Sequence, residues 1–218
     1  MRVLSVNIGH PRTNRWKQST ALTGIDKRPV REPVLVTAPG PKGSGEVGLA
    51  GDRVYDVKHH GGTDQAVYAY AREDLDSWGD ELGRALPNGV FGENLTTEGV
   101  AVNQALIGER WLVGDQLLLE VSCPRIPCGT FQGWLERDGW IKRFTQAVLP
   151  GPYFRVIAPG LVQAGDPVRV VSRPADHQVT VALTFRALTT EPELLPRLLA
   201  VDALPADLLA LARKRSAA

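Results

Sequence analysis

Cys128 is the residue whose type and surroundings best suit it to chemistry. It ends the stretch Pro-Arg-Ile-Pro-Cys at 124–128, where two prolines fix the backbone and remove two N–H donors. The cysteine is therefore expected on a stiff turn after a strand, and Gly129 leaves room for a ligand to approach. Arg125 favours the thiolate, the nucleophilic and metal-binding form. A buried, inert thiol is the alternative for Cys128, and it is the preferred interpretation of Cys123.

A second polar cluster extends over 48–65 and contains Lys-His-His-Gly-Gly at 58–62. Its cationic side chains beside the backbone N–H groups of a glycine pair suit a phosphate ligand. A polar hairpin loop, in which the glycines only supply the turn, explains the same residues. Zinc binding is a weaker third interpretation, because adjacent histidines point to opposite faces of a strand. Its ligands would be His59, His60, Asp52 and Asp56.

A third cluster, at 91–99, places Glu93 and Asn94 directly after a glycine. These two side chains can reach the edge of a ligand ring, or they can cap local turns through hydrogen bonds to the backbone. The sequence contains no serine–histidine–carboxylate arrangement, Walker-type loop or dinucleotide-binding motif. The commonest enzyme classes are therefore excluded.

The elements that must position these clusters are mainly strands. Apolar residues alternate with polar or small ones at 4–8 and 117–121, and 154–162 predicts two strands around a Pro-Gly turn. Glycine and proline are spread along the chain, which favours many short strands joined by turns. We therefore expect a mixed, mainly β domain over 1–172 with a curved or closed sheet, followed by a small helical segment over 173–218.

Helices are predicted at a few places only. Apolar residues at spacings of three and four indicate a helix over 72–86, and a weaker pattern covers 131–148. In the tail, Thr190 and Glu193 resemble a capping box. Leucines at 204–211 predict a last helix that ends in a basic cluster, as suits a helix C-terminus.

Composition sets the class of protein. The chain has 218 residues, 43% of them hydrophobic, and its 25 Lys and Arg against 24 Asp and Glu leave a net charge of +1. Such a balance excludes wholesale disorder and disfavours bulk nucleic-acid binding or an acidic membrane surface. Two cysteines are too few for a disulfide scaffold or a four-cysteine cluster, and no long apolar run or signal-peptide pattern occurs. We expect a cytoplasmic protein with free thiols.

Four short motifs carry a resemblance through their fixed order. They are Gly48-Leu-Ala-Gly-Asp52, His60-Gly-Gly-Thr-Asp64, Phe91-Gly-Glu-Asn-Leu95 and Pro124-Arg-Ile-Pro-Cys128. Together they resemble the MOSC domain, named after the C-terminal domain of molybdenum cofactor sulfurase. The last motif is similar to that of the stand-alone bacterial YiiM-like subgroup, and the tail resembles the helical segment that follows the domain there.

The resemblance implies a β-barrel with peripheral helices, a molybdenum cofactor of the molybdopterin type, and a cysteine that either ligates the metal or carries a persulfide. Pyridoxal phosphate binding is also associated with the family. For the subgroup it implies reduction of N-hydroxylated compounds, including hydroxylaminopurine-type base analogues. A separate protein would supply electrons, and the chain could form a homodimer. The alternatives are a sulfur carrier or sulfurtransferase, and a non-catalytic cofactor-binding module.

The resemblance also assigns roles to residues. The matching cysteine is Cys128, which would bind the metal. We expect Lys58, His60, Gly61, Gly62 and Arg125 to hold the pterin phosphate or ring edge, and Asp52, Arg53, Glu93 and Asn94 to shape the pocket. One departure concerns Gln65, where the subgroup tends to carry a basic residue, so a phosphate contact from that position is in doubt.

Overall fold

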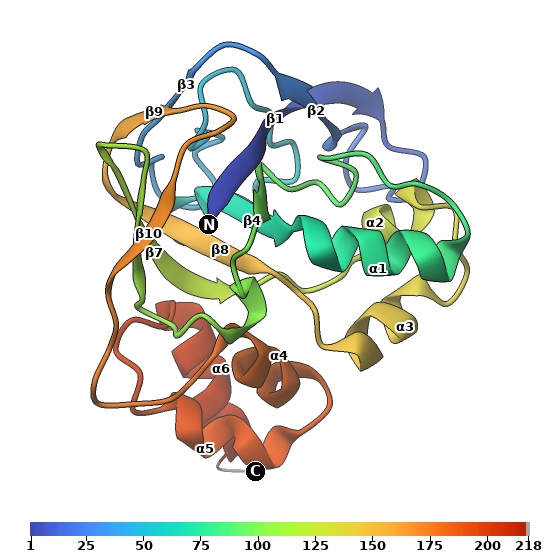
Figure 1. Ribbon diagram of the computed structural model, residues 1–218. Coiled ribbons are helices and arrows are strands. Elements are labelled where there is room, and N and C mark those ends of the chain that lie inside the picture. Colours follow the sequence, from blue (N-terminus) through green and yellow to red (C-terminus); the bar gives the residue numbers. More distant parts are fainter. Residues whose placement is uncertain (217–218) are drawn as a thin grey trace.

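The computed structural model describes residues 1–216 and is dominated by one eight-stranded sheet, with a two-stranded ribbon and several helices around it (Figure 1). The strands are β1 (Arg2–Thr13), β2 (Leu22–Val30), β3 (Val34–Val36), β4 (Val67–Ala71), β5 (Leu95–Glu98), β6 (Arg110–Val113), β7 (Leu117–Pro124), β8 (Pro152–Ala158), β9 (Gly160–Val162) and β10 (Val168–Ser172). The α-helices are α1 (Arg72–Leu82), α2 (Gly129–Trp134), α3 (Trp140–Ala147), α4 (Val181–Thr189), α5 (Leu195–Leu198) and α6 (Ala206–Ser216). Short 3₁₀ turns are η1 (Thr63–Gln65), η2 (Val102–Gln104) and η3 (Pro192–Leu194).

The strand order of the large sheet is β10-β6-β7-β8-β4-β5-β1-β2. Neighbouring strands are antiparallel except β4 and β5, which run parallel. An isolated bridge between Arg2 and Pro167 connects β1 to the segment that enters β10. This pairing does not close the sheet into a barrel. The mixed, sheet-dominated fold is thus confirmed, whereas the barrel implied by the resemblance is not.

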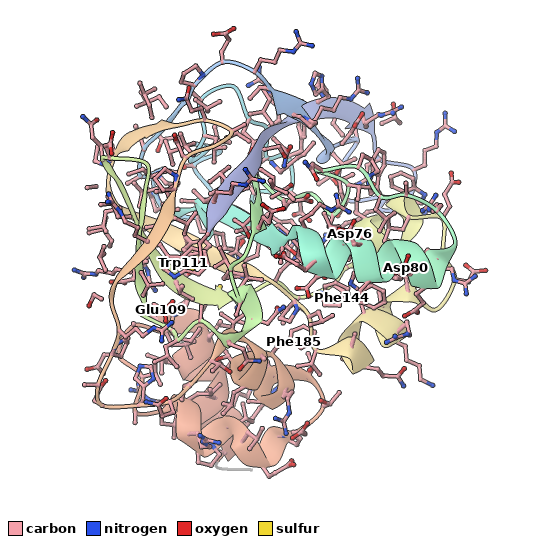
Figure 2. All side chains as sticks on the ribbon, viewed as in Figure 1. Asp76, Asp80, Glu109, Trp111, Phe144 and Phe185 are labelled. Atoms are coloured by element: carbon pink, nitrogen blue, oxygen red, sulfur yellow. The ribbon has the colours of Figure 1, made fainter. Side chains whose placement is uncertain are left out.

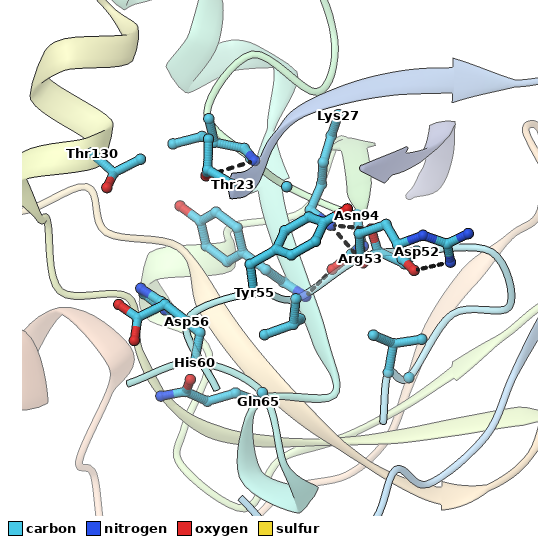
Figure 3. A pocket seen from close by; sticks show the side chains of 18 of the residues that line it. Thr23, Lys27, Asp52, Arg53, Tyr55, Asp56, His60, Gln65, Asn94 and Thr130 are labelled. Atoms are coloured by element: carbon cyan, nitrogen blue, oxygen red, sulfur yellow. Dashed lines mark hydrogen bonds and ion pairs between the residues drawn. The ribbon is translucent and has the colours of Figure 1, made fainter. Parts of the chain in front are cut away.

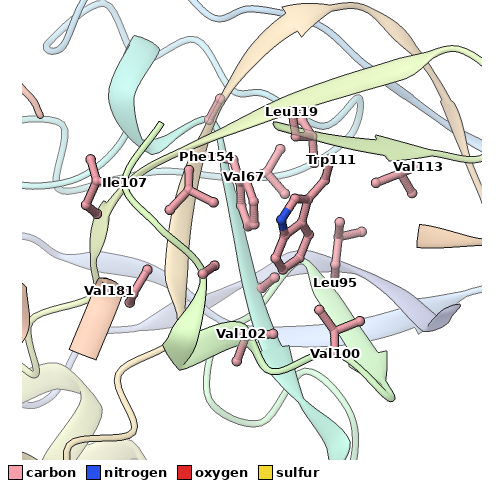
Figure 4. Packing of buried hydrophobic residues seen from close by; sticks show 14 of the residues in the cluster. Val67, Leu95, Val100, Val102, Ile107, Trp111, Val113, Leu119, Phe154 and Val181 are labelled. Carbon is pink, nitrogen blue, oxygen red and sulfur yellow. The ribbon is translucent and has the colours of Figure 1, made fainter. Parts of the chain in front are cut away.

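A buried apolar cluster joins the sheet to the C-terminal helices. Val3 and Val6 of β1 are both buried, because a register shift between Val3 and Ser5 interrupts the alternation. Trp111 packs on Phe154 with their ring centroids 4.8 Å apart (Figure 4). Val181 of α4 belongs to the same cluster. Burial of this much apolar surface is the main favourable term in folding. Whether 1–172 and 173–218 are separate units stays a prediction.

A second buried cluster is aromatic and supports the start of α2. Phe91, Phe131 and Trp140 pack edge to face with their centroids 5.0–5.6 Å apart. Phe144 of α3 meets Phe185 of α4 at 6.3 Å, which ties the C-terminal helices to this cluster as well (Figure 2). Edge-to-face pairs of this kind contribute energy beyond their buried area. The cluster therefore gives α2 and α3 a rigid base.

Three of the predicted helical features change in the structure. The first helix ends at Leu82 rather than 86, because Gly83 takes a left-handed conformation and its N–H bonds back to the carbonyl of Asp80. The segment 131–148 contains two helices, since Glu136 and the glycine at 139 have positive φ and interrupt the turn.

The predicted capping box at Thr190 is wrong. Thr190 lies at the C-terminal end of α4, and the residue that caps the N-terminus of α4 is Thr180, whose hydroxyl accepts the N–H of Leu183.

Arg155 ties the C-terminal helices to the sheet: its guanidinium donates to Asp64 and to the carbonyl of Ala203. Within residues 1–216, no helix has the length and apolar character needed to cross a membrane.

Candidate functional site

The site is a cavity of about 130 Å³ that opens between β2, the loop at 46–62 and the start of α2 (Figure 3). Four segments supply most of its lining, at 20–27, 46–62, 91–94 and 125–130, and the rest comes from Asn14, Pro39, Gln65, Ala66, Tyr68 and Tyr153. Because β2 and β5 flank β1 in the sheet, and β7 leads into α2, the sheet brings these distant segments to one place. Clefts of this kind, with a few polar groups in an apolar wall, are typical of ligand sites.

Cys128 borders this cavity as the residue that precedes α2. Its backbone is extended, it is partly exposed, and its carbonyl accepts the N–H of Gln132. Cys123 differs: it is buried in β7 opposite Tyr153, and burial raises the pKa of its thiol to about 12. The structure therefore brings Cys128, and not Cys123, to the wall of the pocket.

Arg125 is a buried cation in the same wall. Its side chain is 5% exposed, and its guanidinium carbon lies 3.6 Å from the ring centroid of Phe131 and 5.6 Å from that of Tyr68. Within residues 1–216, no carboxylate pairs with it and its Nη1 has no hydrogen-bond partner. Leaving a buried charged donor unpaired is costly, and buried charges are normally paired. The guanidinium can therefore donate hydrogen bonds to an anionic or carbonyl-bearing ligand.

Asp52 belongs to a satisfied network on the opposite wall (Figure 3). Its carboxylate accepts from Lys27 Nζ at 2.5 Å, Asn94 Nδ2 at 2.8 Å and the N–H of Gly9 at 2.7 Å. Burial alone would raise the pKa of the Asp52 carboxyl, but the Lys27 ammonium and the two hydrogen bonds outweigh it and hold that pKa below its ordinary value. The network fixes β2, the 46–62 loop and the 91–94 segment to one another.

The histidine–glycine loop also reaches the pocket, but without the predicted positive charge. Burial, followed by the charge of Arg125, lowers the pKa of His60 from 6.5 to about 4, so its ring is neutral at pH 7. Gly61 and Gly62 have φ of 81° and 78°, a conformation that favours glycine. The prediction of a cationic histidine cradle is therefore wrong for His60, which offers a neutral ring instead.

Two of the predicted residues lie away from the cavity. Lys58 is exposed on the surface turn, outside the described lining. Glu93 is fully buried and accepts hydrogen bonds from the N–H groups of Gly89 and Phe91 and from the Thr96 hydroxyl. It holds its own turn, and burial raises the pKa of its carboxyl. Both assignments as ligand-binding residues lack support in the geometry.

The remaining assignments divide. Arg53 does line the pocket, where its guanidinium bonds the carbonyl of Asp52 at 2.9 Å. The zinc interpretation is wrong for the described part of the chain, which contains no group of three or more His, Cys, Asp or Glu able to hold a metal ion. Its Asp56 is instead paired with Lys17 and with His59.

Lys27 and Tyr153 are among the lining residues that sequence reasoning missed, and Gln65 was treated only as a departure. Gln65 contributes a buried Oε1 that has no hydrogen-bond partner among residues 1–216. The Tyr153 ring packs 5.1 Å from that of Tyr68, and burial raises the pKa of its hydroxyl to about 12. No local pattern marks Lys27, because its partner lies 25 residues further along the chain.

Comparison with known proteins decides the family. The sequence model of the MOSC domain matches residues 56–169, which is more than half of the chain and includes the His-Gly-Gly and Pro-Arg-Ile-Pro-Cys motifs. The chain belongs to the MOSC domain family. YflK of Bacillus subtilis is 33% identical over 171 residues, or 78% of this chain and 73% of YflK. Two further relatives match over shorter shares of their length.

YiiM of Escherichia coli is 34% identical over 142 residues, 63% of this chain and 62% of YiiM. A reductase of Gibberella moniliformis is 32% identical over 139 residues, 62% of this MOSC chain and 24% of that protein. The chain thus corresponds to about a quarter of that reductase. Among solved structures, YiiM from Geobacillus stearothermophilus has a TM-score of 0.77 at 28% identity, covering 98% of both chains. YiiM from Escherichia coli has a TM-score of 0.72 at 25% identity, covering 99% of this chain and 92% of that one.

MOSC domains are associated with the molybdenum cofactor, and the residues of this pocket fit such a group. A soft thiol, Cys128, is accessible at the wall, and soft thiolates suit a sulfur-rich metal centre. Among residues 1–216, Arg125 Nη1 is a donor and Gln65 Oε1 an acceptor without a partner, so the two suit a ring edge that carries both acceptor and donor groups. These two atoms without partners are the observation that favours a bound organic group rather than a bare metal ion.

Proposed function

We propose that this chain is a molybdenum-dependent oxidoreductase that reduces N-hydroxylated compounds, with hydroxylaminopurine-type base analogues as the expected substrates. The observation that carries the proposal is the buried Arg125, unpaired among residues 1–216, in the same cavity lining as the partly exposed thiol of Cys128. The relative named a reductase and the similarity to YiiM agree with it. We place the reaction in the cytoplasm, where free thiols stay reduced.

Each residue has a defined task in this proposal. Cys128 is the thiolate ligand, and Arg125 and Gln65 bind the polar part of the cofactor or substrate. His60 contributes a neutral imidazole that can donate or accept one hydrogen bond. The Lys27–Asp52 pair holds the opposite wall in place. The chemistry that a bound cofactor supplies is a two-electron reduction of the N–OH group, with electrons from a separate donor protein.

A sulfur carrier is the second candidate, in which Cys128 carries a persulfide. One observation favours it: the space beside Gly129, the next residue, is open, so another protein could approach the sulfur. Arg125 lines the same cavity, where its positive charge would favour a bound anion.

The test combines metal analysis with turnover. Protein is produced in cells with and without cofactor biosynthesis, and its molybdenum content and its reduction of hydroxylaminopurine with a chemical electron donor are measured. We expect close to one molybdenum per chain, lost in Cys128→Ser and kept in the matched control Cys123→Ser. Sulfur released by cyanide in the absence of metal would support the carrier. Cofactor retained by Cys128→Ser without any turnover in the parent protein would support a non-catalytic binding module.

A further inference from the structure

The tip of the β1–β2 hairpin, residues 14–21, lies against α2 on one side. A Cβ atom added to Gly133 would lie 2.2 Å from Cδ1 of Trp16, so the indole packs directly on the backbone of α2 and needs glycine there. The ring also meets Trp134 edge to face at 6.4 Å. Asn14 Nδ2 lies 3.5 Å from the hydroxyl of Thr130. Three contacts thus attach the hairpin tip to the helix that follows Cys128.

The hairpin tip is attached to the histidine–glycine loop on its other side. Lys17 Nζ donates to Asp56 Oδ2 at 2.5 Å and lies 3.4 Å from His59 Nδ1. His59 in turn bonds Asp56 at 2.8 Å. Because His59 directly precedes His60, this cluster sets where the next residue enters the pocket.

The hairpin tip is internally ordered and belongs to the pocket. The N–H of Asn14 bonds the carbonyl of Ala21 at 2.9 Å, and Asn14 Nδ2 bonds the Thr20 hydroxyl at 2.9 Å. Asn14 Oδ1 accepts the N–H of Trp16 at 3.2 Å. Both Asn14 and Thr20 line the cavity. A preformed turn therefore spans the two walls that carry Cys128 and His60.

We propose that Trp16 and Lys17 are positioning residues, and that the hairpin tip is a strap that holds the Cys128 wall against the His60 wall and limits access to the thiol. Trp16 acts through the backbone of α2 at Gly133, and Lys17 acts through Asp56 and His59. The strap concerns the same pocket as the proposed reaction but stands without it, because its readout is the reactivity of the thiol alone.

The experiment measures how fast iodoacetamide alkylates Cys128 in the full-length chain, with mass spectrometry to assign the modified residue. Trp16→Ala removes the ring, and Gly133→Ala displaces it while leaving every side chain of the pocket intact. Both should raise the alkylation rate of Cys128 about fivefold, the factor by which one ordinary aromatic pair biases an open–closed equilibrium. Trp16→Phe keeps an aromatic ring and should restore a rate close to that of the parent protein.

Two controls make the result specific. In the double variant Trp16→Ala, Gly133→Ala, the added methyl group has no ring to displace, so the rate should equal that of Trp16→Ala alone. Buried Cys123 serves as an internal reporter and should stay unmodified, since its labelling would signal loss of the fold. If Trp16→Ala labels Cys123, Lys17→Gln decides, because it releases only the other end of the strap. An unchanged Cys128 rate in Gly133→Ala and Lys17→Gln would overturn the proposal.

Discussion

Two buried cations face the pocket, and they differ in one respect: Lys27 has a carboxylate partner and Arg125 has none among the described residues. The same substitution, to methionine, should therefore affect stability differently at the two positions. Methionine is unbranched and fills irregular space, so it replaces either side chain with little change in packing. What changes is the charge and its hydrogen bonds.

At Lys27, the substitution leaves the Asp52 carboxylate without its cationic partner. The side chains of Lys27 and Asp52 are only 9% and 6% exposed, so Asp52 would keep its negative charge, or take up a proton, in a poorly hydrated site. Breaking one partner out of a buried pair costs roughly 3–5 kcal/mol. Asn94 and Gly9 still donate to Asp52, so we expect the low end, about 3 kcal/mol. For a chain of this size that corresponds to a fall in Tm of roughly 6–12 °C.

At Arg125, the substitution removes an unsatisfied donor. The loss is the contact of the guanidinium with Phe131, worth about 1–2 kcal/mol in a desolvated site. The gain is relief of a buried N–H without a partner, worth about 1–3 kcal/mol. The two nearly cancel, so Arg125→Met should change the free energy of unfolding by less than about 1 kcal/mol, or raise it. Binding of the cofactor should nevertheless be lost.

The assay is urea unfolding followed by tryptophan fluorescence, on both variants and the parent protein. Equal slopes in urea would show that the denatured states are comparable. Molybdenum content after expression with cofactor biosynthesis gives the binding result for the same samples. A loss of stability in Arg125→Met as large as that in Lys27→Met would refute the reasoning, because it would mean that the Arg125 charge is compensated in the folded chain.

Two further predictions concern the histidine–glycine loop. The pKa of His60 is about 4 in the folded chain and has its ordinary value of 6.5 in the unfolded chain. Between these two pH values, the unfolded chain therefore binds a proton at His60 that the folded chain does not. The free energy of unfolding should therefore fall as pH is lowered from 6.5 towards 4, by at most about 1.4 kcal/mol per pH unit, and His60→Gln should flatten this part of the curve. Gly61→Ala should cost about 1 kcal/mol in urea unfolding, for its positive φ alone. Gly62→Ala should cost roughly 1–3 kcal/mol more, because its Cβ would lie 2.6 Å from the backbone nitrogen of Lys42; equal losses would contradict this.

The sequence predicted the parts of the site that depend on neighbours in the chain. The turn that presents Cys128 follows from Pro124 and Pro127, whose effect on the backbone is local. Lys27 could not be found in this way, because it meets Asp52 only when β2 is placed beside the 46–62 loop. Adjacent residues also face different surroundings: Asn94 reaches the pocket whereas Glu93 is buried in its own turn.

The strands and helices also differ in how far the sequence predicted them. Alternation predicted β7 and β8, where buried and partly exposed residues alternate over the first half of each strand. It did not reveal β4, because all five residues of that strand are buried. The break in the segment 131–148 was not predicted, since Glu136 adopts a positive φ that its residue type does not announce. Thr190 is a residue type that often begins a helix, but α4 already extends to Thr189, and the next helical turn begins only at Pro192.

Arg155 has a consequence for exchanging parts between relatives. Its guanidinium bonds Asp64, two residues after Gly62, and the carbonyl of Ala203 in the tail, and it sits in the strand that also carries Tyr153. A chimera that grafts a foreign C-terminal tail onto residues 1–172 must supply a carbonyl at the same place. Otherwise the arginine keeps only Asp64 and Glu120 as partners, and the link between the tail and the loop beside the pocket is lost, so tail and loop should be transplanted together.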